Sequence, residues 1–117
     1  MQILSEHGHV VLKLGPARRK SGLNRQELEY FHLLQGGGHR HVAFEPHEFC
    51  WAPRTTYTPD FFVITKTGDH EYHEVKGHRW PASIVKFKTA ANLHRAAKFY
   101  LATKKRGQWF VKEQSTL

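Results

Sequence analysis

Two carboxylates and a lysine occur at the spacing that metal-assisted hydrolysis requires. Glu74 and Lys76 flank Val75, and Asp60 begins the preceding apolar run. Residues two apart on a strand share a face, so Glu74 and Lys76 point the same way while Val75 points into apolar packing. A turn signal near Gly68 predicts an antiparallel hairpin that brings Asp60 opposite this pair. We therefore predict one patch of sheet that carries two carboxylates and a lysine.

This trio suits the hydrolysis of phosphodiester bonds with a divalent metal. Charged groups within apolar strands are costly unless they are paired or bind a metal. Carboxylate oxygens suit Mg²⁺ or Mn²⁺, which can polarise a phosphate and lower the pKa of a bound water. Lys76 could orient that water or stabilise developing negative charge. The alternative that spacing alone leaves open is a cross-strand salt bridge on a solvated face.

A helix over Arg25–Gln35 is expected to add a third carboxylate. Glu27 shares a helical stripe with the apolar positions 30, 31 and 34, whereas Glu29 is expected to face solvent. Asn24 is a predicted N-cap, and Glu27 stands where the acidic member of a capping box belongs. Glu27 could therefore join the metal site or only cap the helix, and the two roles compete for the same oxygens.

The other elements define the frame that holds these residues. We expect a loosely held basic arm with one short strand over residues 1–20, ahead of a single domain over 21–117. Within that domain, strands are expected over 41–51 with a break at Pro46, over 56–65 and over 70–76. A second helix is expected over 81–98, followed by strands over 99–102 and 108–112. This order predicts an α/β fold in which a mixed β-sheet is flanked by helices.

The composition points to a polyanionic partner. The chain has 117 residues, with 18 Lys and Arg against 10 Asp and Glu, so its net charge is +8 with histidines neutral. Nucleic acid is the first expectation for such a balance. No apolar run is long enough to span a membrane and no signal peptide is visible, so we expect no membrane contact. The single cysteine, Cys50, suits the cytoplasm, and the ten histidines are expected on the surface.

Three short motifs, taken in order, resemble those of a nuclease superfamily. They are NRQELEY at 24–30, YTPDF at 57–61 and EVKG at 74–77. The chain resembles the PD-(D/E)XK nucleases, and among them the small phage-type endonucleases and Holliday junction resolvases of the endonuclease I kind. The resemblance covers roughly residues 21–111.

The resemblance implies a fold and a set of roles. It implies a restriction-endonuclease-like αβββαβ core. It implies Asp60 and Glu74 as metal ligands with the Val75 carbonyl as a third, Lys76 as the catalytic lysine, and Glu27 as the helix carboxylate that completes the site. The cofactor would be Mg²⁺, with Mn²⁺ as a substitute, and an activated water would cut DNA.

Basic residues near the motifs and in two clusters are the expected DNA contacts. The clusters could equally be solvated charged turns. The residues expected to meet DNA are Arg18, Arg19, Lys20, His78, Arg79, Lys86, Lys88, Lys104, Lys105 and Arg106.

The expected substrate is branched DNA, such as a Holliday junction, in phage recombination or DNA processing. A junction resolvase would be a homodimer, because two symmetric cuts need two sites. The alternatives are a nicking or weakly specific DNase, which could act as a monomer, and a non-catalytic DNA-binding module on the same fold. The expected location is the cytoplasm of a phage-infected or prophage-bearing bacterium.

Overall fold

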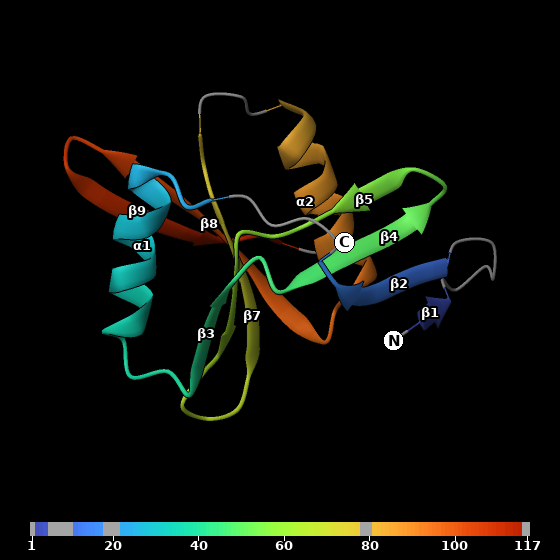
Figure 1. The fold of residues 1–117 in the computed structure, drawn as a ribbon, viewed down its shortest axis with the longest axis horizontal. Helices are drawn as coiled ribbons and strands as arrows, with labels where there is room; N and C mark the ends of the chain where they lie inside the picture. Colours follow the sequence, from blue (N-terminus) through green and yellow to red (C-terminus); the bar gives the residue numbers. More distant parts are fainter. Residues whose placement is uncertain (1, 5–10, 18–21, 78–80, 116–117) are drawn as a thin grey trace.

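The computed structural model describes residues 2–4, 11–17, 22–77 and 81–115 (Figure 1). These residues form a mixed α/β fold with two helices and two sheets, and most of the regular structure is strand. The elements in chain order are β1 (Gln2–Leu4), β2 (Val11–Pro16), α1 (Arg25–Gln35), β3 (His41–Phe44), β4 (His47–Ala52), β5 (Thr55–Tyr57), β6 (Phe61–Ile64), β7 (His70–Val75), α2 (Pro81–Leu93), β8 (Ala97–Lys105) and β9 (Gln108–Glu113).

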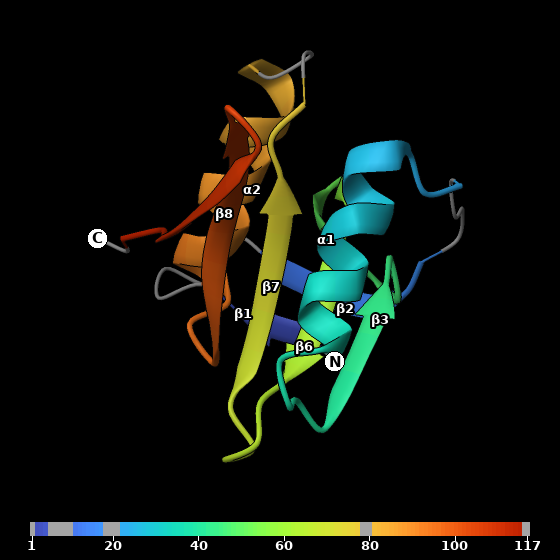
Figure 2. The ribbon, with the colours of Figure 1, turned by 90° about the vertical axis from the view of Figure 1, so that its left-hand side faces the viewer.

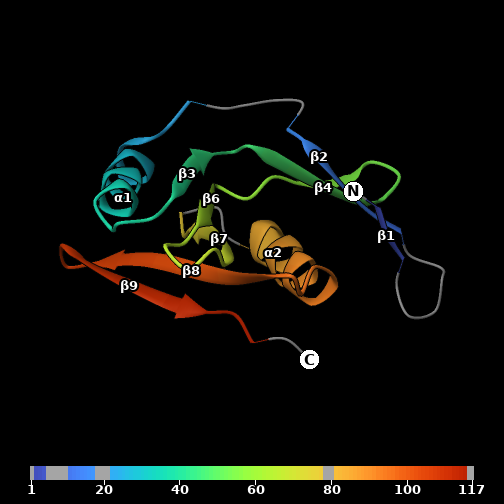
Figure 3. The same cartoon turned by 90° about the horizontal axis from the view of Figure 1, so that it is seen from below.

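A five-stranded sheet with the order β3-β6-β7-β8-β9 forms the centre of the molecule. Helix α1 covers one face, and α2 lies on the other with β6 and β7 between the two helices (Figures 2 and 3). The pair β7 and β8 is parallel and the other pairs are antiparallel. Helix α2 makes the connection that a parallel pair requires. The predicted mixed sheet flanked by helices is confirmed.

A second sheet of four strands, in the order β1-β2-β4-β5, packs on the α2 side of the first. The buried core between them joins Phe49 of β4 and Tyr57 of β5 to Tyr72 of β7 and Phe87 of α2. The sequence predicts a single short strand in the arm, whereas the structure has two. Leu12 of β2 is almost fully buried in this core, so β2 is an integral part of the small sheet.

The predicted strand over 56–65 is wrong, because two strands in different sheets occupy that range. Strand β5 ends at Tyr57 in the small sheet, and β6 begins at Phe61 in the large one. Pro59 lies in the break and has no N–H to donate to a ladder. The segment 58–60 therefore passes from one sheet to the other, and Asp60 lies at that crossing.

The predicted boundaries of the second helix and the following strand also need correction. Helix α2 ends at Leu93, and β8 starts at Ala97 and continues to Lys105. The His94 N–H closes the last helical turn on the Ala90 carbonyl, and Ala97 then pairs in parallel with the start of β7. The turn between β8 and β9 consists of two residues of positive φ, Arg106 and Gly107, as in a tight hairpin.

Neither helix in the described parts of the chain is long and apolar enough to cross a membrane.

Candidate active site

Asp60 and Glu74 meet at the end of the β6–β7 hairpin, as the turn near Gly68 predicts. Phe61 pairs with His73, so the next position along the ladder sets Asp60 opposite Glu74. The Asp60 N–H donates to Glu74 Oε1 at 3.3 Å, and the Val75 N–H donates to Asp60 Oδ2 at 2.7 Å. Each carboxylate is therefore oriented by backbone of the other's strand, and the two side chains have little freedom to separate.

Tyr57 holds Glu74 from the small sheet, and sequence reasoning assigned it no role. Its hydroxyl donates to Glu74 Oε1 at 2.7 Å. Both side chains are buried. The signal available in the sequence was the position of Tyr57 three residues before Asp60, but its side chain reaches Glu74 only because the chain crosses between sheets at 58–60.

Burial and neighbouring negative charges strongly perturb the pKa values of this pair. Burial raises the pKa of Asp60 to about 9, and the negative charge of Glu74 adds to the effect. Burial raises the pKa of Glu74 to about 7, although hydrogen bonds from the Tyr57 hydroxyl and the Asp60 N–H oppose the rise. Strongly perturbed carboxyl groups in a pocket are typical of functional sites. Such a pair favours a bound cation, whose charge would offset the cost of ionising both.

Glu27 caps α1, and its charge also acts on the carboxylate pair, whereas its expected role in a metal site stays a prediction. The Asn24 N–H donates to Glu27 Oε1 at 2.9 Å and the Glu27 N–H donates to Asn24 Oδ1 at 2.8 Å, which confirms the predicted capping box. The Glu27 carboxyl also contributes to raising the pKa of both Asp60 and Glu74. It therefore lies close enough to the pair to act on it electrostatically while it caps α1.

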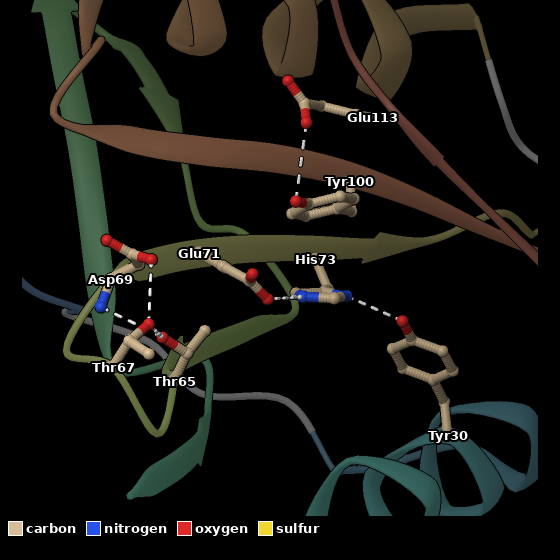
Figure 4. Close-up of polar contacts among 8 residues, drawn as sticks. All are labelled: Tyr30, Thr65, Thr67, Asp69, Glu71, His73, Tyr100 and Glu113. Atoms are coloured by element: carbon tan, nitrogen blue, oxygen red, sulfur yellow. Dashed lines mark hydrogen bonds and ion pairs between the residues drawn. The ribbon is translucent and has the colours of Figure 1, made fainter. Parts of the chain in front are cut away.

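A buried hydrogen-bond chain fixes α1 against β7, and with it the position of Glu27 one turn earlier. Tyr30 of α1 donates to His73 Nδ1 at 2.7 Å, because His73 Nε2 lies 2.9 Å from the Glu71 carboxylate and must donate there (Figure 4). Tyr100 stacks on the His73 ring with the centroids 4.9 Å apart. His73 directly precedes Glu74 on β7, so the chain aligns the helix with the strand that carries the site.

Glu29 and the histidines differ in part from what the sequence leads us to expect. The Glu29 side chain stays 42% exposed, but its carboxylate also accepts from Lys104 Nζ at 2.7 Å and from Trp109 Nε1 at 2.9 Å. The reason is that β8 and β9 extend far enough to pack beside α1, as Figure 1 shows. His73 and His94 are buried, not on the surface; His73 is held by its hydrogen bonds, and His94 packs edge-on against Phe49.

Glu45 is a fourth carboxylate at this place, and sequence reasoning missed it. It is buried, it has a φ of 48°, and its N–H donates to the Asp60 carbonyl at 2.8 Å. Its negative charge contributes to raising the pKa of Glu74. A left-handed backbone at a non-glycine residue is uncommon and costs free energy. The break expected at Pro46 was the only local signal, and it gave no indication that Glu45 would turn toward Asp60.

A pocket of about 350 Å³ opens beside the carboxylate pair. Lys86 of α2 lines it and brings a cation to the acidic wall. Its expected contact with DNA stays a prediction. Its lining comprises Glu45, Thr56, Tyr57, Thr58, Asp60, Glu74, Ala82, Ser83 and Lys86. The pocket therefore collects groups from both sheets and from α2.

Lys76 and Val75 follow Glu74 at the end of β7. The Lys76 N–H donates to the Ala102 carbonyl at 2.8 Å and continues the parallel ladder past Val75. The Lys76 side chain is half-buried and is not part of the pocket lining. Its expected catalytic role and the expected metal ligation by the Val75 carbonyl stay predictions.

The donor set fits a magnesium ion better than a softer metal. In the described part of the chain, no group of three or more His, Cys, Asp or Glu side chains is arranged to hold a metal ion. Magnesium does not require such a cage, because it binds through one or two carboxylates and keeps several waters. Asp60 and Glu74 supply that pair of hard oxygen ligands next to an open pocket.

Apart from Lys86, which lines the pocket, the expected DNA contacts fall into three groups. Lys88, Lys105 and Arg106 are exposed. Lys104 is turned to α1 by its ion pair with Glu29, so its charge is partly neutralised. Arg18, Arg19, Lys20, His78 and Arg79 lie outside the described residues.

No protein-family model, curated protein or solved structure matches this chain. The family resemblance therefore rests on the three motifs.

Proposed function

We propose that this chain is a divalent-metal-dependent DNA endonuclease that hydrolyses phosphodiester bonds. The observation that carries the proposal is the Asp60–Glu74 pair: two carboxyl groups oriented by backbone N–H donors, with pKa values of about 9 and 7, beside a pocket that contains Lys86. The alternative of a cross-strand salt bridge would need a basic side chain paired with one of these carboxylates. Glu74 instead accepts from the Asp60 N–H, and Asp60 accepts from the Val75 N–H. The net charge of +8 supports a polyanionic substrate.

The fold supports the proposal through the order of its elements. Helix α1 precedes β3, β6 and β7, α2 follows, and β8 then pairs in parallel with β7. This order is compatible with an αβββαβ core of the PD-(D/E)XK type. The small sheet is an addition to such a core, and it supplies Tyr57 and part of the pocket wall.

In this proposal each residue has a defined task. Asp60 and Glu74 would hold Mg²⁺, and the Tyr57 hydroxyl keeps the Glu74 oxygens in place. The bound metal would polarise the phosphate and lower the pKa of a coordinated water. Lys86 would stabilise the negative charge that develops on the phosphate. An attacking water would form the new P–O bond and release a proton to solvent. The P–O bond to the leaving oxygen of the DNA strand would break, and that oxygen would take up a proton from solvent.

The substrate class proposed is branched or otherwise open DNA, with the symmetric cutting of a junction assigned to a homodimer. Basic side chains that contact phosphates read no base sequence directly, which favours selection by DNA shape over selection by sequence. The same site would serve a nicking or weakly specific DNase.

The test is cleavage of matched substrates by matched variants. Four-way, flap and linear DNA are incubated with Mg²⁺ or Mn²⁺ and the wild type, Asp60→Asn, Glu74→Gln or the exposed control Glu113→Gln. We expect cutting by the wild type and the control, and a loss of at least about 100-fold in the two pocket variants, because each removes a ligand charge. Full activity of Asp60→Asn with Mg²⁺ would refute the mechanism. DNA binding by the wild type without any cutting would assign the chain to the non-catalytic binding modules.

A further inference from the structure

In the large sheet, the pairing of the strands places residues of the last strand, β9, on the same face as Glu74. Glu74 pairs with Leu101 of β8, and Leu101 pairs with Lys112 of β9. Directly paired residues lie on the same face of a sheet. Neighbouring strands are about 4.8 Å apart, so the Lys112 backbone lies about 10 Å from that of Glu74 along this row.

The next row along the strands brings an exposed aromatic ring to the same face. Phe110 pairs with Thr103 and stands two residues before Lys112, so both side chains are on one side of β9. Phe110 is 54% exposed, although phenylalanine is usually buried. Lys105, the last residue of β8, pairs with Gln108 of β9 in the last row and is also exposed. We call Lys105 of β8 together with Phe110 and Lys112 of β9 the β9 strip.

The opposite face of the same hairpin is different in kind. There Lys104 and Trp109 both reach Glu29 of α1. Val111 pairs with Ala102, which is buried in the core on the α1 side. One face of the β8–β9 hairpin therefore contacts α1, and the face shared with Glu74 presents two lysines around an exposed ring.

We propose that the β9 strip binds unpaired nucleotides of the DNA substrate, with Phe110 stacking on a base and the two lysines contacting phosphates. The proposal rests on the proposed nuclease function, since it places the strip next to the cleaved bond. A base in a duplex has both faces covered by its neighbours, so an exposed ring can stack only where a nucleotide is open. Lysines on either side suit a phosphate backbone that follows the strand.

The alternative occupant of the strip would be a second copy of the chain, because β9 is an edge strand and edge strands can pair. Electrostatic repulsion opposes this self-association. Two copies, each of net charge +8, would bring the like-charged Lys105 and Lys112 side chains together. Nucleic acid is complementary to the same charges.

The experiment measures binding apart from cleavage. Fluorescently labelled duplex DNA, blunt or with a single-stranded tail, is titrated with the wild type, Phe110→Ala, Phe110→Tyr or Val111→Ala in buffer that contains EDTA. Val111 is the matched control, because it is also exposed on β9, at 48%, but on the other face. Melting curves of each variant verify that it is folded.

Loss of base stacking should weaken binding of the tailed DNA by about 5- to 100-fold in Phe110→Ala. Phe110→Tyr and Val111→Ala should bind as the wild type does, and binding of the blunt duplex should change little in any variant. Equal binding of tailed DNA by Phe110→Ala and the wild type would overturn the proposal, as would an equal loss on blunt and tailed DNA. A dimer in light scattering that Phe110→Ala dissociates would assign the strip to self-association instead.

The failure of this proposal and that of the nuclease can be told apart. If the wild type cleaves DNA with Mg²⁺ and Phe110→Ala does not change binding, only the proposal for the β9 strip is refuted. If Phe110 is needed for binding of tailed DNA but the wild type does not cleave, the proposal for the strip stands and the proposed nuclease function is refuted.

Discussion

Replacement of Glu74 by glutamine should stabilise the metal-free protein while it abolishes cleavage. Burial raises the pKa of Glu74 from an ordinary 4.5 to about 7. An acid with a higher pKa in the folded state binds its proton more tightly there, so it stabilises the fold below its unfolded pKa. That stabilisation is lost as the pH rises through the folded pKa. At pH 8 the folded protein therefore carries the full cost of ionising this buried carboxyl.

The size of the effect follows from the pKa difference. One pKa unit corresponds to about 1.4 kcal/mol, so a rise from 4.5 to about 7 costs about 3 kcal/mol at pH 8. In the Glu74→Gln variant the amide oxygen can still accept from Tyr57 and the Asp60 N–H, with about 1 kcal/mol lost because a neutral acceptor is weaker than a carboxylate. About 2 kcal/mol remains. For a chain of this length that corresponds to a rise in Tm of roughly 8 °C.

The assay is thermal unfolding in EDTA, followed by circular dichroism at pH 5.5 and pH 8. The quantity of interest is the Tm of Glu74→Gln minus that of the wild type, because both proteins carry the same histidines and their titration cancels. This difference should be larger at pH 8 than at pH 5.5. Glu113→Gln, exposed on β9, is the control and should show little change at either pH. A Tm difference that is zero or negative at pH 8 and independent of pH would refute the reasoning.

Three further perturbations test other parts of the structure. Tyr57→Phe removes the hydroxyl that lowers the pKa of Glu74, so the acidic limb of the pH–rate profile should move to higher pH; an unchanged limb would contradict this. Tyr30→Phe leaves the buried His73 Nδ1 without its hydrogen-bond donor. The free energy of unfolding measured in urea should fall by about 1–3 kcal/mol. The control Phe31→Leu, on the same helix, should lower this free energy by less. Burial lowers the pKa of His94, whose Nδ1 has no partner among the described residues. A base whose pKa is lowered in the folded state stabilises the fold at pH values above its unfolded pKa, and this stabilisation is lost as the pH falls. The Tm of His94→Gln should therefore decline less steeply below about pH 6.5 than that of the wild type. An equally steep decline would refute the claim that burial lowers the pKa of His94.

The parts of the site that the sequence predicts are those fixed by local geometry. The turn near Gly68 sets the register of one hairpin, and register alone brings Asp60 opposite Glu74. The capping box at Asn24 is equally local, since its members are three residues apart. Neither depends on how the rest of the chain folds.

The parts that were missed depend on packing between distant segments. Tyr57 reaches Glu74 because the small sheet packs on the large one, and Glu45 reaches Asp60 through a left-handed turn between strands of different sheets. The Glu29 carboxylate accepts a hydrogen bond from Trp109, eighty residues away in the chain. The hydrophobic pattern of a single segment cannot predict such contacts. Side chains alternate between the two faces of a strand in the same way whichever sheet the strand joins.

The position of Asp60 between the two sheets links folding to chemistry. Its N–H is used by Glu74 of the large sheet and its carbonyl by Glu45, which leads into the small sheet. Separation of the sheets would therefore release the Asp60 backbone from both sides and remove Tyr57 from Glu74. Because the carboxylates repel each other when ionised, they stay together only while this packing holds or a cation joins them. Under the proposed function, the excess of basic residues would attract the polyanion, whereas the packing between the two sheets holds the few buried acids together at one point.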